Sequence, residues 1–180
     1  MSRDLSNFIV MAIGHEPEHL KSELVDPEVV QSVKNCITES LNKYKQIYPD
    51  IWVITHMRRG SGQYVAEVCI NENIPFTGVL SYNGFESGWN EDDQILYDEL
   101  LHQADEVHVT SPGDNAGYKS AVRDKWMMIN SHCALIVYNP QRKSGETHNA
   151  VVELQRIRKP VIAIKPGIQS KVKEIKMENF

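Results

Sequence analysis

Six short apolar runs, separated by amphipathic stretches, dominate this chain of 180 residues. The runs, which we expect to be strands, are residues 8–13, 51–55, 76–80, 106–110, 134–138 and 160–164. In the five intervening stretches apolar residues recur every three or four positions, the period of a helix. These predicted helices are residues 27–47, 63–73, 92–103, 116–131 and 147–158. Strands that alternate with helices are typical of a parallel sheet covered on both faces. We therefore predict an α/β three-layer sandwich with a mainly parallel sheet of about six strands.

The length of the chain suits one domain. We assign residues 1–165 to it and expect residues 166–180 to form a charged, loosely held C-terminal tail. In such sheets the crossovers are right-handed, and ligands bind outside the carboxyl ends of the strands where the strand order reverses. The turns that follow the strands are therefore the first place to look for function.

Composition narrows the class of protein. A net charge of −5 argues against a protein that coats nucleic acid, because such proteins concentrate Lys and Arg. The first apolar run, of six residues, is too short to span a membrane. The three cysteines are odd in number and widely separated, and the histidines are scattered, so we expect no disulfide, metal or cofactor. A cytoplasmic location fits these features.

The first two strands end in glycine-containing turns. Gly14 and His15 follow the first strand, where a phosphate could approach the backbone closely. The second strand is followed by the ligand-binding candidates Arg58, Arg59, Gly60, Ser61 and Gly62. This segment places two guanidinium groups at a helix N-terminus, which favours anions. The alternative for both segments is an ordinary turn with solvated side chains.

Two later turns have a similar composition. After the fifth strand, Ser144, Gly145, Thr147 and Asn149 offer backbone and side-chain donors, although a simple turn capped by Thr147 is equally compatible with the pattern. After the fourth strand, the candidates are Ser111, Tyr118, which could stack on a base or simply pack, and Arg123, which could reach a phosphate.

Parallel strands present their carboxyl ends at one edge of a sheet, so these turns should converge. The convergence predicts a pocket for a nucleotide or a nucleotide-derived small molecule. Tyr82, Phe85 and Trp89 follow the third strand and form either a rim of this pocket or a partly buried surface loop.

In these segments the sequence resembles the SLOG superfamily of Rossmann-like proteins, and within it the YpsA-like group. The resemblance covers residues 8–165, and the order and spacing of its motifs are more specific than any one motif. The matching motifs are Gly14-His15-x-Pro17, Thr55-x-Met57-x-x-Gly60, Ala66-Glu67, Ile74-Pro75, Trp89, Arg123-x-x-Trp126-Met127 and Gly145-x-Thr147-x-Asn149-Ala150-Val151.

The resemblance implies a nucleotide-related ligand bound across the turns after strands one, two and five, often in a homo-oligomer. The related Lonely Guy enzymes cleave the N-glycosidic bond of nucleoside monophosphates and carry Pro-Gly-Gly-x-Gly-Thr followed by a catalytic glutamate. This chain departs from that motif over residues 144–150 and has no acid directly after Thr147. Family members also tend to have Gly at the position of His56 and Arg at that of Glu16.

Three classes of function therefore stay open. The first is a domain that binds or senses a nucleotide-like molecule. The second is an N-glycosidase acting on a nucleoside monophosphate, for which Glu67 and Glu146 are the catalytic candidates, since such chemistry needs a positioned acid or base. The third is a structural or partner-binding protein whose pocket has no ligand.

Overall fold

The computed structural model describes residues 6–17, 26–111 and 118–175. The strands are β1 (Phe8–Gly14), β2 (Ile51–Thr55), β3 (Phe76–Leu80), β4 (Glu106–Val109), β5 (Cys133–Val137), β6 (Val161–Lys165) and β7 (Lys171–Ile175). The helices are α1 (Pro27–Ile47), α2 (Ser61–Asn71), α3 (Glu91–His102), α4 (Lys119–Ile129) and α5 (Glu146–Arg156). Over the described residues, no helix is long and apolar enough to cross a membrane.

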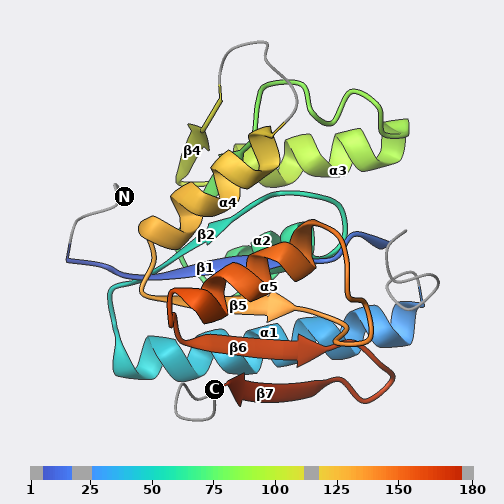
Figure 1. Cartoon of the computed structure of the whole chain (residues 1–180). Helices are drawn as coiled ribbons and strands as arrows, with labels where there is room; N and C mark the ends of the chain where they lie inside the picture. Colours follow the sequence, from blue (N-terminus) through green and yellow to red (C-terminus); the bar gives the residue numbers. More distant parts are fainter. Residues whose placement is uncertain (1–5, 18–25, 112–117, 176–180) are drawn as a thin grey trace.

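The elements form three layers (Figure 1). Alternate residues of each central strand point to opposite faces of the sheet. Val10 and Ala12 of β1 therefore join a core with α1, α2 and α3, whereas Met11 and Ile13 join a second core with α4 and α5. Strands β2, β3 and β5 are buried along their whole length, which explains why they are continuous apolar runs in the sequence.

The strand order is β4-β3-β2-β1-β5-β6-β7, and every neighbouring pair is parallel except β6 and β7. The chain moves outward from β1 to β4 and then returns to the other side of β1 with β5. The order thus reverses between β1 and β5, where Gly14 is paired with Val137. This reversal opens a crevice at the carboxyl ends of the two strands, the usual ligand position in open α/β sheets.

The structure confirms the predicted α/β sandwich, with most element bounds within two residues of those expected. Part of the predicted helix 116–131 lies outside the described residues, and α4 is described from Lys119.

The C-terminal segment differs from the prediction of a loose tail. Residues 171–175 form a seventh strand, antiparallel to β6, with Val172 opposite Ile164. Lysines are common in edge strands because they discourage pairing with other chains, so a charged edge strand resembles a solvated tail in sequence. Residues 166–170 connect β6 to β7, and the last part of the predicted tail, residues 176–180, lies outside the described residues.

Candidate functional site

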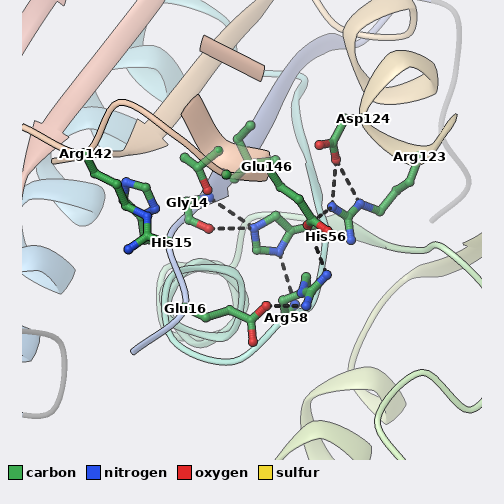
Figure 2. A pocket seen from close by; sticks show the side chains of 12 residues that line it. Gly14, His15, Glu16, His56, Arg58, Arg123, Asp124, Arg142 and Glu146 are labelled. Atoms are coloured by element: carbon green, nitrogen blue, oxygen red, sulfur yellow. Dashed lines mark hydrogen bonds and ion pairs between the residues drawn. The ribbon is translucent and has the colours of Figure 1, made fainter. Parts of the chain in front are cut away.

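A narrow pocket lies at the carboxyl edge of the sheet, at the crevice between β1 and β5 (Figure 2). Its walls come from the ends of β1 and β2, from α4, and from the turn that precedes α5. Its lining residues are Ile13, Gly14, His15, Glu16, His56, Arg58, Arg123, Asp124, Arg142, Gly145, Glu146 and Thr147. Only about 20 Å³ is free inside it, roughly the space that one water occupies. Five of the lining side chains, Glu16, Arg58, Arg123, Asp124 and Glu146, form ion pairs with one another.

Arg58, three residues after β2, is the central cation of the pocket. Its Nη1 donates to Glu146 Oε2 at 3.1 Å and lies 3.5 Å from Ser120 Oγ, and its Nη2 forms an ion pair with Glu16. The guanidinium therefore links the β1 turn to the first residue of α5 and to the first turn of α4.

Arg123, on α4, is the second cation and is almost completely buried, with 1% of its surface exposed. Its Nε and Nη2 donate to Asp124 Oδ1 at 2.9 and 2.8 Å, and Nη2 lies 3.9 Å from Glu146 Oε2. Nη1 is buried and has no hydrogen-bond partner within residues 6–17, 26–111 and 118–175. An unsatisfied buried guanidinium donor is costly, and it lies in the wall of the pocket.

The carboxyl group of Asp124 offsets the positive charge of Arg123 only in part. Burial raises the pKa of the Asp124 carboxyl, the guanidinium of Arg123 opposes this shift, and the nearby carboxylate of Glu146 adds to it. The protonated form of Asp124 is therefore favoured more than in water. Protonation of this carboxyl would leave the Arg123 charge beside the more distant carboxylate of Glu146, 3.9 Å from Nη2, a situation that favours a further anion in the pocket.

Glu16 joins the two arginines that follow β2. This carboxylate is 7% exposed, pairs with Arg58 and lies 3.7 Å from Nη2 of Arg59. Arg59 points away from the pocket: it donates to Asp93 at 3.1 Å, and its guanidinium lies 5.4 Å from the ring centre of Trp89. The two predicted ligand-binding arginines thus have different environments, and only Arg58 lines the pocket.

His56 fills the space between β1 and the start of α2. Its Nε2 lies 3.0 Å from the Gly14 nitrogen and 3.3 Å from the Gly14 oxygen, and its Nδ1 accepts from the Arg58 N–H at 3.1 Å. Burial lowers the pKa of His56 well below its usual value, and the charges of Arg123 and Arg58 lower it further. A neutral imidazole therefore occupies the position where an anion could otherwise meet the β1 backbone.

The glycines near the pocket are required by close packing. A Cβ at Gly14 would lie 2.6 Å from Ser61 Cβ and 2.8 Å from the Val137 oxygen, and one at Gly62 would lie 2.4 Å from His56 Nδ1. Gly60 has a φ of 73°, in the left-handed region, and faces Pro17. Ser61 Oγ donates to the carbonyl of His15 at 2.7 Å. The predicted cradle of Gly60, Ser61 and Gly62 is therefore used to pack α2 against the β1 turn.

The turn before α5 contributes Gly145, Glu146 and Thr147 to the pocket. Gly145 caps the helix with a φ of 93°, which L-residues adopt rarely. Glu146, the first helical residue, is 54% exposed at its side chain. A carboxylate is favourable at a helix N-terminus and beside two arginines, so Glu146 occupies the position that suits an exogenous anion.

Several other predicted site residues lie outside this pocket. Glu67, a catalytic candidate, forms an ion pair with Lys34 across α1 and α2. Asn149 lines another cavity, of about 330 Å³ between α4 and α5, which shares Asp124 and Glu146 with the pocket. Ser144 is exposed, and neither it nor Ser111 lines the pocket.

A wider cavity adjoins the pocket and contains Tyr118. Its volume is about 450 Å³, and its lining residues are Arg58, Ser81, Tyr82, Phe85, Tyr118, Lys119, Ser120, Ala121 and Glu146. Arg58 and Glu146 line both spaces, so this ion pair separates them. Trp89 does not line the cavity and instead packs edge-on against Phe85 and Tyr97. The predicted aromatic rim is therefore divided between the cavity wall and the core.

A protein-family comparison identifies the chain. The model of the YspA SLOG family matches residues 10–162, which includes most of β1, the strands from β2 to β5 and every residue that lines the pocket. The chain belongs to the YspA SLOG family.

Two further relatives are consistent with this assignment. A UPF0398 protein from Lactobacillus delbrueckii subsp. bulgaricus is 30% identical over 124 residues, and the match spans 64% of this SLOG chain and 64% of that protein. The X-ray structure of DNA processing protein A (DprA) from Streptococcus pneumoniae superposes with a TM-score of 0.62 at 13% identity. The superposition covers 91% of this chain and 52% of DprA. At this level of identity it shows a shared fold.

Besides the apolar Ile13, four residues lining the pocket of this SLOG domain were predicted neither as ligand-binding nor as catalytic: Glu16, His56, Asp124 and Arg142. Glu16 and His56 could have been found, because each departs from the family pattern directly after a strand. Asp124 and Arg142 gave no local signal, since their role depends on the packing of α4 and of the α5 turn against β1. Within the described residues, no cluster of three His, Cys, Asp or Glu side chains could hold a metal ion.

Proposed function

We propose that this SLOG domain binds a nucleotide or nucleotide-derived small molecule, whose phosphate lies at the pocket lined by Arg58 and Arg123. The observation that carries the proposal is the buried Nη1 of Arg123, which has no hydrogen-bond partner among the residues that the structure describes and belongs to a side chain in the wall of that pocket. A phosphate would supply the missing acceptor.

The electrostatics support an anion of this kind. Guanidinium groups match phosphate oxygens with two parallel hydrogen bonds, and the N-terminus of α5 adds a partial positive charge at the same place. Glu146 now occupies part of this space, with its Oε2 3.1 Å from Arg58 and 3.9 Å from Arg123. Ligand entry therefore requires Glu146 to move, which its exposed position allows.

Binding is favoured over N-glycosidase activity. Of the two catalytic candidates, Glu67 is paired with Lys34 and does not line the pocket, so a glycosidase would depend on Glu146. Glu146 is engaged by the guanidinium of Arg58, so it would have to leave this ion pair before it could act on a leaving base. Release of free base from a nucleoside monophosphate by the purified protein, abolished in Glu146→Gln, would instead establish the enzyme.

The decisive experiment combines mass spectrometry and calorimetry. Small molecules released by denaturing freshly purified protein are identified, and their binding is measured together with that of AMP. We expect saturation at hundredfold excess over Kd to stabilise the fold by about 2.7 kcal/mol. Arg58→Ala should weaken binding at least tenfold, while Arg156→Ala, which removes an exposed arginine at the last residue of α5, should not. A protein that binds no nucleotide and releases none contradicts the proposal.

Two other expectations belong to the proposal. DprA is a DNA processing protein, but the charge of −5 on this chain favours a small ligand over a nucleic acid. We also propose a homo-oligomer, as the resemblance to SLOG relatives implied. Light scattering that gives the mass of one chain at micromolar concentration would contradict the second expectation.

A further inference from the structure

We propose that the wider cavity beside the pocket holds the planar ring of a nucleoside monophosphate whose phosphate lies at Arg58. This inference rests on the proposed function and adds the position and chemical class of the rest of the ligand. The cavity is lined by the end of β3, the first turn of α4 and the first residue of α5.

The volumes of the pocket and of the wider cavity indicate that different parts of the ligand occupy each of them. The arginine pocket, with about 20 Å³ free, has no room for a base or a sugar. The wider cavity, of about 450 Å³, lies within the range of small-molecule sites. Because Arg58 and Glu146 line both, a phosphate on Arg58 would leave the attached sugar and ring to extend into the wider cavity.

The chemistry of the wider cavity suits an aromatic ring. Tyr82, Phe85 and Tyr118 provide aromatic surface, and such surfaces stack on nucleobases of any kind. The Tyr82 ring is fixed from two sides: the Lys119 ammonium lies 4.3 Å from its centre, and Phe85 meets it edge-on at 6.2 Å. Tyr118 is 69% exposed at the start of α4, an unusual position for a tyrosine that only packs.

Polar groups in the same cavity suit the remainder of the ligand. Lys119 is 7% exposed and brings a second positive charge near Arg58, while Ser81 and Ser120 add hydroxyl groups for a sugar. Ser120 Oγ already lies 3.5 Å from Arg58 Nη1, at the boundary between the two spaces. A base, a sugar and a phosphate would thus each meet groups of matching chemistry.

Calorimetry with two probes tests the inference on the full chain. AMP and ribose 5-phosphate share the sugar and phosphate, so their difference in Kd reports the contribution of the ring. We expect AMP to bind about tenfold tighter than ribose 5-phosphate to the wild-type protein. Tyr118→Ala, at an exposed position, should remove most of that preference and leave the Kd for ribose 5-phosphate unchanged.

Two further variants complete the design. Tyr82→Leu keeps apolar volume but removes the π-face, and should also reduce the preference for AMP. Ile129→Ala removes an exposed apolar side chain at the far end of α4 and should leave both Kd values unchanged.

The outcomes separate the two proposals. Equal affinity of the wild type for both probes, or a preference for AMP that survives in both tyrosine variants, overturns the inference and leaves the phosphate site intact. Absence of binding by either probe overturns the proposed function, and the inference with it.

Discussion

Arg58 and Glu146 face each other across the pocket, with Nη1 of the arginine 3.1 Å from Oε2 of the glutamate. The two residues are 88 positions apart, and each follows a different strand of the parallel sheet. Their ion pair closes the narrow pocket towards the wider cavity. The carboxylate of Glu146 therefore takes the place of a ligand anion and competes with one.

Removing this competing charge should tighten binding. We expect Glu146→Gln to bind AMP roughly 3- to 10-fold more tightly, because one carboxylate no longer opposes a phosphate a few ångströms away. Glu153→Gln is the matched control, since it removes the same charge from the same helix, where Glu153 pairs with Arg156. Calorimetry of the three proteins gives the comparison. Weaker binding by Glu146→Gln would show that the carboxylate contacts the ligand favourably.

The packing of α2 against β1 predicts the cost of a side chain at Gly14. The Cβ of Gly14→Ala would meet Ser61 Cβ and the Val137 oxygen at 2.6 and 2.8 Å, and both lie in the buried core. We expect roughly 1–3 kcal/mol of lost stability, measured by urea unfolding. Gly88→Ala, where the new Cβ meets nothing within 4 Å, should be nearly neutral. Equal stabilities of the two variants would mean that the end of β1 can relax.

The elements of the fold were predictable because their signals are local. The helical period over residues 27–47 and the buried run at residues 51–55 gave elements with the predicted bounds, since burial on both faces of the sheet demands uninterrupted apolar residues. Strand β7 gave no such signal. Its lysines alternate with other residues on an exposed edge, and only its pairing with β6 makes it a strand.

The sequence predicted which turns form the pocket but not the orientation of their side chains. The sheet topology brought Gly14, Arg58, Arg123 and Gly145 to one pocket, as the convergence of parallel strand ends predicts. Sequence could not show which arginine would turn inward. Arg59 instead contacts Asp93 and Trp89, and these contacts depend on where α3 packs. The sequence also could not show that Ser61 would bond to the carbonyl of His15, or that Gly62 would pack against the ring of His56.

The lowered pKa of His56 predicts how the free energy of unfolding depends on pH. An unfolded histidine has a pKa of about 6.5, and burial lowers the folded value well below it. At pH values between these two pKa values, His56 carries a proton in the unfolded chain that it lacks in the folded chain. The free energy of unfolding should therefore fall as the pH drops below about 6.5, by at most about 1.4 kcal/mol per pH unit from this group.

Urea unfolding between pH 7.5 and 5 measures this dependence. His56→Gln keeps a hydrogen-bonding side chain but cannot titrate, so its stability should vary less with pH than that of the wild type. His102→Gln removes an exposed histidine of α3 and should retain the wild-type slope. Identical slopes in all three proteins would show that the buried imidazole does not control acid stability.

Strand β7 predicts that the C-terminal segment contributes to stability. Deleting residues 166–180 removes the pairing with β6 and two contacts to α1, in which the Ser170 nitrogen donates to Ser32 Oγ and the Ser170 oxygen accepts from Cys36. It also exposes β6 as a new sheet edge, which promotes association between chains. We expect a lower midpoint of thermal unfolding, by several degrees, and more aggregation on heating. Deleting residues 176–180 alone keeps β7 and should leave the midpoint unchanged. If both truncated proteins unfold at the wild-type temperature, the segment is the loosely held tail that its charges suggest.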